Sequence, residues 1–315
     1  MPTDEFKKLL DRDFAKASAQ PLTEITTPLL PELVNAALMA FRRSEVEAAE
    51  KGKENEDVAA FILFRQIIEL ADGIEVLFAH SCGTPAIPSL RSQFEASVGL
   101  SYLLSEDANY VERSLSWLVA NIHSGIRERG TLEPGTAKGE QYEKLYEREF
   151  GRPATGQPNA AIAAEIKAME DGLQNPQFAP IEAEYQRSKK AVNRVPPWYS
   201  LFGGPRNLAE LAEATGNGAL YRLLYGDWSG LGHANDLRRF LSSENGRPMF
   251  DAVRRPDELQ HIAQHSALLL LRAIRQMINK FRHGESLVGW YLREVKPLLD
   301  RLSNLQIEFT PIVER

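Results

Sequence analysis

Helical spacing of apolar residues runs through almost the whole chain and constrains its fold more than any other feature. From Val58 to Phe78 apolar residues lie on most helical faces, with too few breaks for strands. A second apolar segment, Ser89 to Leu104, follows Pro85 and Pro88, and proline suits the first turn of a helix. No alternating pattern of useful strand length occurs. The sequence therefore predicts an all-α multi-helix bundle.

Proline and glycine divide this bundle. Between Gly130 and Asn207 they separate short amphipathic pieces such as Gln141 to Phe150 and Ala160 to Met169. We therefore expect residues 130–207 to form an inserted peripheral helical lobe or lid. Residues 1–129 would then hold the N-terminal helices and the first half of the core bundle, and residues 208–315 its second half and the C-terminal helices.

Composition narrows the class of protein. A net charge of -6 argues against broad capture of nucleic acid, which depends on counterion release, although a local basic groove is compatible with it. A single cysteine, Cys82, excludes an internal disulfide and a cysteine-based zinc cluster within the chain. The first residues show no apolar signal segment and no window approaches eighteen apolar residues, so we expect a cytoplasmic protein without a membrane partner.

Two charged residues interrupt the apolar segment from Ser89 to Leu104. Arg91 and Glu95 lie four residues apart and therefore share one helical face. A charged pair in such an apolar helix invites a functional interpretation, because burial of an ion pair stabilises a fold poorly. A purely structural pair remains the alternative.

A second polar pattern occupies the predicted helix from Ala219 to about Gly232. Tyr221, Tyr225, Ser229 and His233 recur at every fourth position and form one slowly drifting stripe. Tyrosine and serine can position a substrate, and histidine can act as an acid or base near neutral pH. The intervening Gly226, Gly230 and Gly232 suggest close approach by another helix or a ligand. A structural role for the histidine is the alternative.

Other polar residues give weaker signals. His261 and His265 have the spacing of a metal pair but lack a clear third ligand, so packing is favoured and no metal is predicted. Arg65 and Glu69 could neighbour Arg91 and Glu95, or form the solvated side of their own helix. Phosphate-binding loops, dinucleotide motifs and nucleophile elbows are absent from the sequence, so we predict no cofactor.

At its two polar helices the chain resembles an uncharacterised bacterial family defined only as a domain of unknown function. The resemblance covers about Val58 to Leu241 and rests on Leu90-Arg91-Ser92-x-Phe94-Glu95-Ala96 with Tyr102-Leu103, on Trp198, on Leu208-Ala209-Glu210, and on Tyr221 and Tyr225 with Ser229-x-x-x-His233. It implies an all-helical fold that pairs the arginine and glutamate of one helix with the tyrosine, serine and histidine of the other, and it implies no activity.

The family's general pattern is similar to the large helical superfamily of nucleotide-binding and ribonuclease domains, many of them toxins or antiphage effectors. Members that cut RNA carry an arginine followed, after four to six residues, by a histidine. Arg254 or Arg255 with His261 has this spacing, but Pro256 stands where those enzymes usually have a polar residue. A match of this kind is also expected about once by chance in such a sequence.

These observations lead to two functional hypotheses. In the first, the protein is an RNA- or nucleotide-acting effector, such as a metal-free ribonuclease-like toxin or an antiphage defence component. His233 would be its acid or base, Arg91 its phosphate ligand, Glu95 would orient Arg91, and Tyr225 and Ser229 would position substrate. In the second, it is a non-catalytic helical interaction module of a defence or toxin–antitoxin system, with a partner protein. The long apolar helix from Pro256 to Phe281 would either support a homodimer or close the chain's own core.

Overall fold

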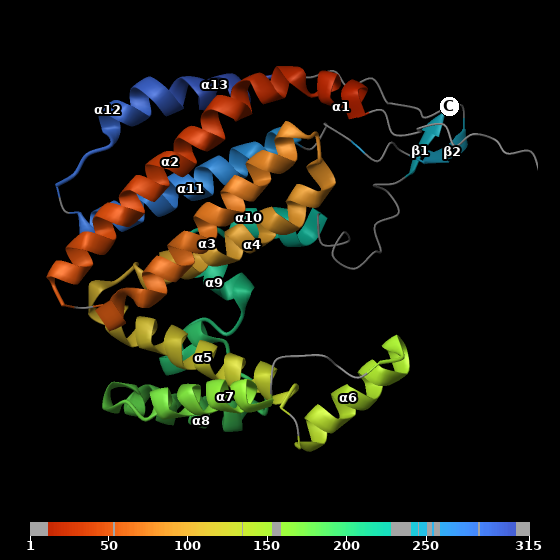
Figure 1. Cartoon of the computed structure of the whole chain (residues 1–315). Coiled ribbons are helices and arrows are strands. Elements are labelled where there is room, and N and C mark those ends of the chain that lie inside the picture. Colours follow the sequence, from red (N-terminus) through yellow and green to blue (C-terminus); the bar gives the residue numbers. More distant parts are fainter. Residues whose placement is uncertain are drawn as a thin grey trace, which may run out of the picture. The chain divides into compact units, whose positions relative to one another are not determined.

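The structure is a computed structural model that describes residues 12–52, 54–133, 135–152, 159–227, 241–244, 246–250, 254, 259–282 and 284–306. It confirms the all-α fold (Figure 1). Within these ranges the regular elements are helices, apart from one antiparallel hairpin formed by β1 (Leu241–Glu244) and β2 (Arg247–Phe250). Contacts divide the chain into two compact units, one made of residues 1–105 and 212–315 and the other of residues 106–211.

The first unit is discontinuous in sequence and contains the longest helices. These are α2 (Gln20–Glu50), α3 (Glu54–Ala79), α4 (Gly83–Leu103) and α11 (Leu259–Phe281). Shorter elements accompany them: α1 (Arg12–Ser18), α10 (Gly218–Arg222), the π-helix η4 (Leu223–Asp227), α12 (Val288–Trp290), the π-helix η7 (Tyr291–Val295) and α13 (Lys296–Ser303). None of the helices in the described ranges is long and apolar enough to cross a membrane.

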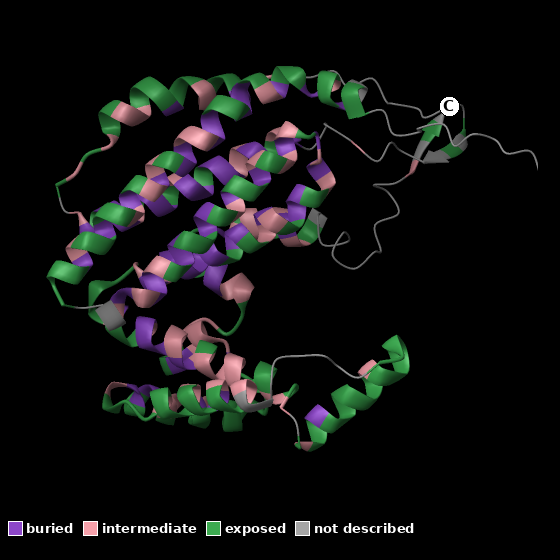
Figure 2. Cartoon of the chain, viewed as in Figure 1, coloured by how far each residue is buried: buried purple, intermediate pink, exposed green. Residues whose placement is uncertain are grey.

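The core of the first unit lies where α2, α3, α4 and α11 pack together. Leu30, Phe64, Leu90 and Leu270, one from each helix, have no exposed surface. On α11 the buried residues recur every three or four positions, as a single apolar stripe requires. Figure 2 shows, in purple, that the buried residues of these helices gather on the faces where the helices meet. The apolar stripe of α11 is therefore covered by helices of its own unit.

Two helices of this unit differ from their predicted form. α4 begins at Gly83 rather than Ser89, so Pro85 occupies its first turn while Pro88 lies inside the helix. The predicted helix from Ala219 to Gly232 is a short α-helix, α10, that continues as the π-helix η4. Its expected end falls outside the described residues. A change in backbone hydrogen bonding of this kind does not alter the apolar periodicity from which the helix was predicted.

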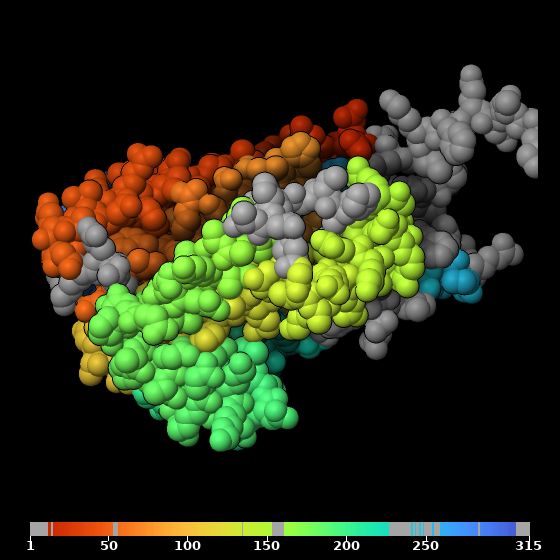
Figure 3. Space-filling model, turned by 60° about the horizontal axis from the view of Figure 1, so that its bottom comes forward, coloured from red at the N-terminus to blue at the C-terminus, as the bar shows by residue number. Residues whose placement is uncertain are grey.

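The second unit has a small core of its own. Its elements are the 3₁₀ segment η1 (Asp107–Asn109), α5 (Tyr110–Gly130), α6 (Ala137–Phe150), α7 (Asn159–Leu173), the 3₁₀ segment η2 (Pro176–Phe178), α8 (Ala179–Val192), the kinked 3₁₀ segment η3 (Trp198–Gly203) and α9 (Leu208–Ala214), within which the unit ends. Val119, Phe178, Ile181 and Tyr185 are buried together. Figure 3 shows residues of α7 and α8, in green, side by side on one face of this unit.

The limits of this compact unit differ from the predicted lobe at residues 130–207. The difference arises because α5, which the sequence placed in the main bundle, packs against α7, α8 and η3. Its buried residues include Leu115 and Val119, which belong to the core of the second unit. Periodicity reveals that α5 has an apolar face, but it does not reveal which helices cover that face.

Candidate functional site

Helix α4 holds Arg91 and Glu95 on a face that the bundle does not cover. Leu90 and Phe94, beside them in sequence, are fully buried, whereas Glu95 is exposed and Arg91 is half-buried. The core therefore does not enclose this charged pair, a question that the sequence had left open. Because α4 buries only part of its circumference, a polar stripe can reach solvent from a helix whose composition is mostly apolar.

Tyr225 of η4 contacts both of these residues. Its hydroxyl donates a hydrogen bond to the Glu95 carboxylate, and the Arg91 guanidinium carbon lies 4.3 Å from the centre of its ring. The ring also lies beside Phe94, with centroids 6.4 Å apart. The predicted contact between the two polar helices is thus confirmed for Tyr225. Ser229 and His233, the other two members of the stripe, lie outside the described residues.

The stacking of Tyr221 on Tyr225 follows from the local backbone. Their ring centroids are 4.8 Å apart and the ring planes differ by 13°. Tyr221 lies in α10 and Tyr225 in η4, and residues four apart share one face of a helix. π-Turns of this sort are frequent at functional sites.

Asn217, the residue before α10, links this helix to α11. Its buried side chain accepts a hydrogen bond from Arg272 of α11, and its carbonyl accepts one from the Tyr221 backbone at 2.9 Å. These contacts set the position of the tyrosine pair relative to α11. A Cβ at Gly226 would meet no atom within 4 Å, so the predicted close approach is not found at this glycine.

The surroundings keep the Tyr225 hydroxyl protonated. Burial raises the pKa of Tyr225, the hydrogen bond to Glu95 and the charge of Glu95 raise it further, and Arg91 opposes the change. Tyr225 is therefore a neutral hydrogen-bond donor at neutral pH. Glu95 orients Tyr225 directly, whereas the sequence interpretation had assigned it to Arg91. Arg91 rests against the aromatic face, where cation–π attraction contributes roughly 0.5–2 kcal/mol.

The remaining residues singled out in the sequence have other partners. Arg65 and Glu69 form an exposed ion pair with each other at 2.7 Å, which places them on the solvated side of α3. Arg254 donates a hydrogen bond to the His80 carbonyl, and Arg255 is not described. Burial, followed by the charge of His261, lowers the pKa of His265. Among the described residues no cluster of three or more histidine, cysteine or acidic side chains could hold a metal.

Sequence reasoning missed a contact between a histidine and a glutamate in the second unit. His123 Nε2 lies 2.7 Å from Glu182 Oε2, and the imidazole stacks on the buried ring of Tyr185 at a centroid distance of 4.3 Å. Glu182 also accepts a hydrogen bond from Gln186. The pair links α5 to α8. Its two members are 59 positions apart, so no local spacing could have indicated it.

One comparison with known proteins gives a match. The model of a family described as a family of unknown function (DUF5677) matches residues 57–248. This segment includes Arg91, Glu95 and Tyr225, and it leaves out α2 and α11. No curated protein and no solved structure matches the chain.

Proposed function

We propose that this chain, which belongs to the family of unknown function DUF5677, binds a phosphate of RNA or of a nucleotide at the cluster formed by Arg91, Glu95, Tyr221 and Tyr225. The observation that carries the proposal is the Arg91 guanidinium resting on the Tyr225 ring, whose hydroxyl is fixed by Glu95. A guanidinium is planar, and when a ring holds it in one orientation its N–H groups form a fixed fork that matches the oxygens of a phosphate.

The stacked tyrosines supply the second element of such a site. Single-stranded RNA is commonly bound by aromatic side chains on which bases stack, with basic residues along the backbone. Stacking contributes roughly 1–3 kcal/mol for each base. Tyr221 and Tyr225 are both only partly buried, so their ring pair reaches the surface beside Arg91. Phosphate would therefore be recognised from α4 and the base from α10 and η4, at adjoining positions of one site.

The finer proposal is metal-free cleavage of RNA. His233 would accept the proton of a 2′-hydroxyl as that oxygen bonds to phosphorus, the bond to the 5′-oxygen would break, and a proton would return to the leaving oxygen. Arg91 would stabilise the charge that develops on the phosphate, and Ser229 would position the substrate. Such an activity suits a toxin-like or antiphage effector.

Fluorescence anisotropy with a labelled single-stranded RNA tests the binding step. Arg91→Ala should weaken binding by about 10- to 100-fold, the loss of one or two charge-assisted hydrogen bonds, and should lower stability by no more than the roughly 0.5–2 kcal/mol of its cation–π contact. Arg42→Ala is the matched control, because Arg42 is exposed on α2 and is not part of the cluster. Equal affinity of the Arg91→Ala variant and the wild type for RNA and for a labelled nucleotide would overturn the proposal.

The acidic net charge of -6, together with the engagement of Glu95 by Tyr225, favours a second candidate, a non-catalytic interaction module. His233→Ala separates the two functions. If the protein cleaves RNA in the presence of a chelator, this variant should lose cleavage and keep its melting temperature. A lower melting temperature, with no cleavage by either protein, supports the interaction module.

A further inference from the structure

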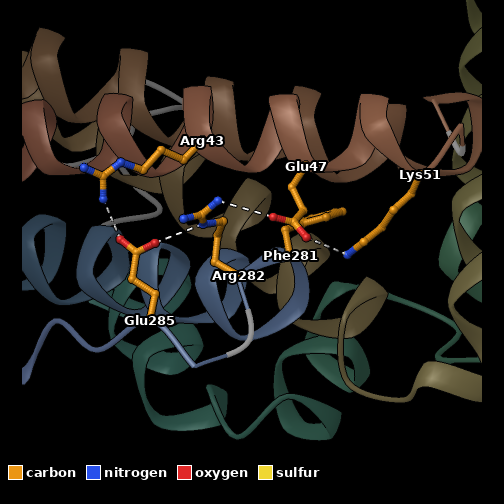
Figure 4. Close-up of a pocket in the computed structure, with 6 residues that line it drawn as sticks. All are labelled: Arg43, Glu47, Lys51, Phe281, Arg282 and Glu285. Carbon is orange, nitrogen blue, oxygen red and sulfur yellow. Dashed lines mark hydrogen bonds and ion pairs between the residues drawn. The ribbon is translucent and has the colours of Figure 1, made fainter.

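A second polar site lies in the first unit, between α2 and the end of α11 (Figure 4). It is a pocket of about 510 Å³, within the range of small-molecule sites. Arg43 and Glu47 lie one turn apart on one face of α2, and Lys51, four residues further on, caps the C-terminal end of that helix. The opposite side consists of the buried Phe281, with Arg282 and Glu285.

The charged side chains form one chain of alternating sign. Arg43 Nη1 lies 2.7 Å from Glu285 Oε1, and Arg282 Nε lies 3.0 Å from Glu285 Oε2. Arg282 Nη1 lies 3.3 Å from Glu47 Oε2, and Lys51 Nζ lies 3.2 Å from Glu47 Oε1. Each of the four carboxylate oxygens therefore faces a cation. Three cations stand against two carboxylates, which leaves the pocket with one net positive charge.

The pocket has more N–H donors than carboxylate oxygens to accept their hydrogen bonds. A guanidinium has five N–H groups and an ammonium has three, whereas each carboxylate offers two oxygens. The two cations at the ends of the chain, Arg43 and Lys51, each contact one carboxylate of the pocket, and their side chains are 50% and 49% exposed. N–H groups are thus in excess within the pocket, while every carboxylate oxygen has a partner. A ligand that adds to this arrangement must supply acceptors and negative charge.

We infer that this pocket binds the phosphate or carboxylate group of a small molecule, with Arg43, Lys51 and Arg282 as its ligands. The inference is independent of the proposed function, because none of these residues belongs to the Arg91 cluster. All of them also lie outside the segment that the family model matches. Glu285 contacts both Arg43 and Arg282 and so holds these two cations in place before the anion arrives, as a preorganised site requires.

Isothermal titration of the full chain with inorganic phosphate, and separately with succinate, tests the inference. Sodium chloride at matched ionic strength serves as the blank. Arg43→Gln and Lys51→Gln should each weaken binding about tenfold, since each removes a charged donor. Arg42→Gln is the matched control: it removes the same charge from an exposed position of the same helix without lining the pocket, and should bind as the wild type does.

Glu47→Gln gives the sharper outcome, because its expected effect has the opposite sign. Losing this carboxylate raises the net charge of the pocket and frees donors of Arg282 and Lys51, so phosphate or succinate should bind several-fold more tightly. A network that only joins α2 to α11 would show no such gain. The inference is overturned if neither anion binds above the chloride blank, or if Arg42→Gln weakens binding as much as Arg43→Gln and Lys51→Gln do.

Discussion

The Arg91 cluster and the α2–α11 pocket both combine arginine with glutamate, but they hold the arginine by different means. In the cluster, the guanidinium lies on an aromatic ring and the carboxylate accepts from a neutral hydroxyl. In the pocket, every contact of the two carboxylates is with a cation. The first site therefore depends on packing and the second on charge, and the two should respond differently to truncation and to pH.

Removing the Tyr225 ring should have the largest effect on stability. Tyr225→Ala deletes the contacts with Arg91, Phe94 and Tyr221, and we expect a loss of about 2 kcal/mol, less than for a fully buried aromatic residue. Arg43→Ala in the pocket should cost less than about 1 kcal/mol, as exposed ion pairs do. Urea unfolding measures both values. Equal losses would show that the two sites are not distinguished by packing.

Alkaline titration should reveal the protected hydroxyl of Tyr225. Its pKa is raised in the folded protein by burial and then by Glu95, so the folded state keeps this proton longer than the unfolded state does. The resulting stability is present below the unfolded pKa of about 10 and is lost as pH rises through the folded value. Between those limits the wild type should lose stability more steeply than Tyr225→Phe. Tyr185, whose pKa burial also raises, is common to both proteins.

Acid titration should show the smallest effect, in the pocket. Burial by itself would raise the pKa of Glu285, but hydrogen bonds from Arg282 and Arg43 outweigh it and lower the pKa. The stability from this group is therefore present above the unfolded pKa of about 4.3 and is lost as pH falls through the folded value. Glu285→Gln lacks this carboxylate, so its free energy of unfolding should fall less than that of the wild type as the pH is lowered. The difference between the two proteins should be less than about 1 kcal/mol. An unchanged acid limb would contradict the assigned contacts.

Local patterns in the sequence were sufficient for the helices and for half of the first site. The periodicity from Val58 to Phe78 predicted α3, and the spacing of Arg91 and Glu95 placed both on one face. Their contact with Tyr225, which is 130 positions from Glu95, was implied by the family resemblance. The spacing of Tyr221 and Tyr225 placed them on one stripe, but the π-turn at η4 could not be predicted, because it leaves the apolar pattern unchanged.

The pocket could not be found in this way. Its decisive contacts join residues 242 and 235 positions apart, and each residue alone is an ordinary charge on the solvated side of a helix. Only the packing of α2 against α11 brings these charges together. For the same reason, the sequence could not predict that α5 packs in the second unit, because an apolar face does not specify which helices cover it.

The discontinuity of the first unit has a consequence for how the protein is made. On the ribosome, α2 and α3 emerge before α4, and α4 ends roughly 150 residues before α11 begins, which at 5–20 residues per second is a delay of roughly 8 to 30 seconds. During that time the whole of the second unit is synthesised and can close its own small core. The apolar faces that α11 later covers stay uncovered in the nascent chain throughout this interval. These faces, on α2, α3 and α4, are where a chaperone would be needed during synthesis.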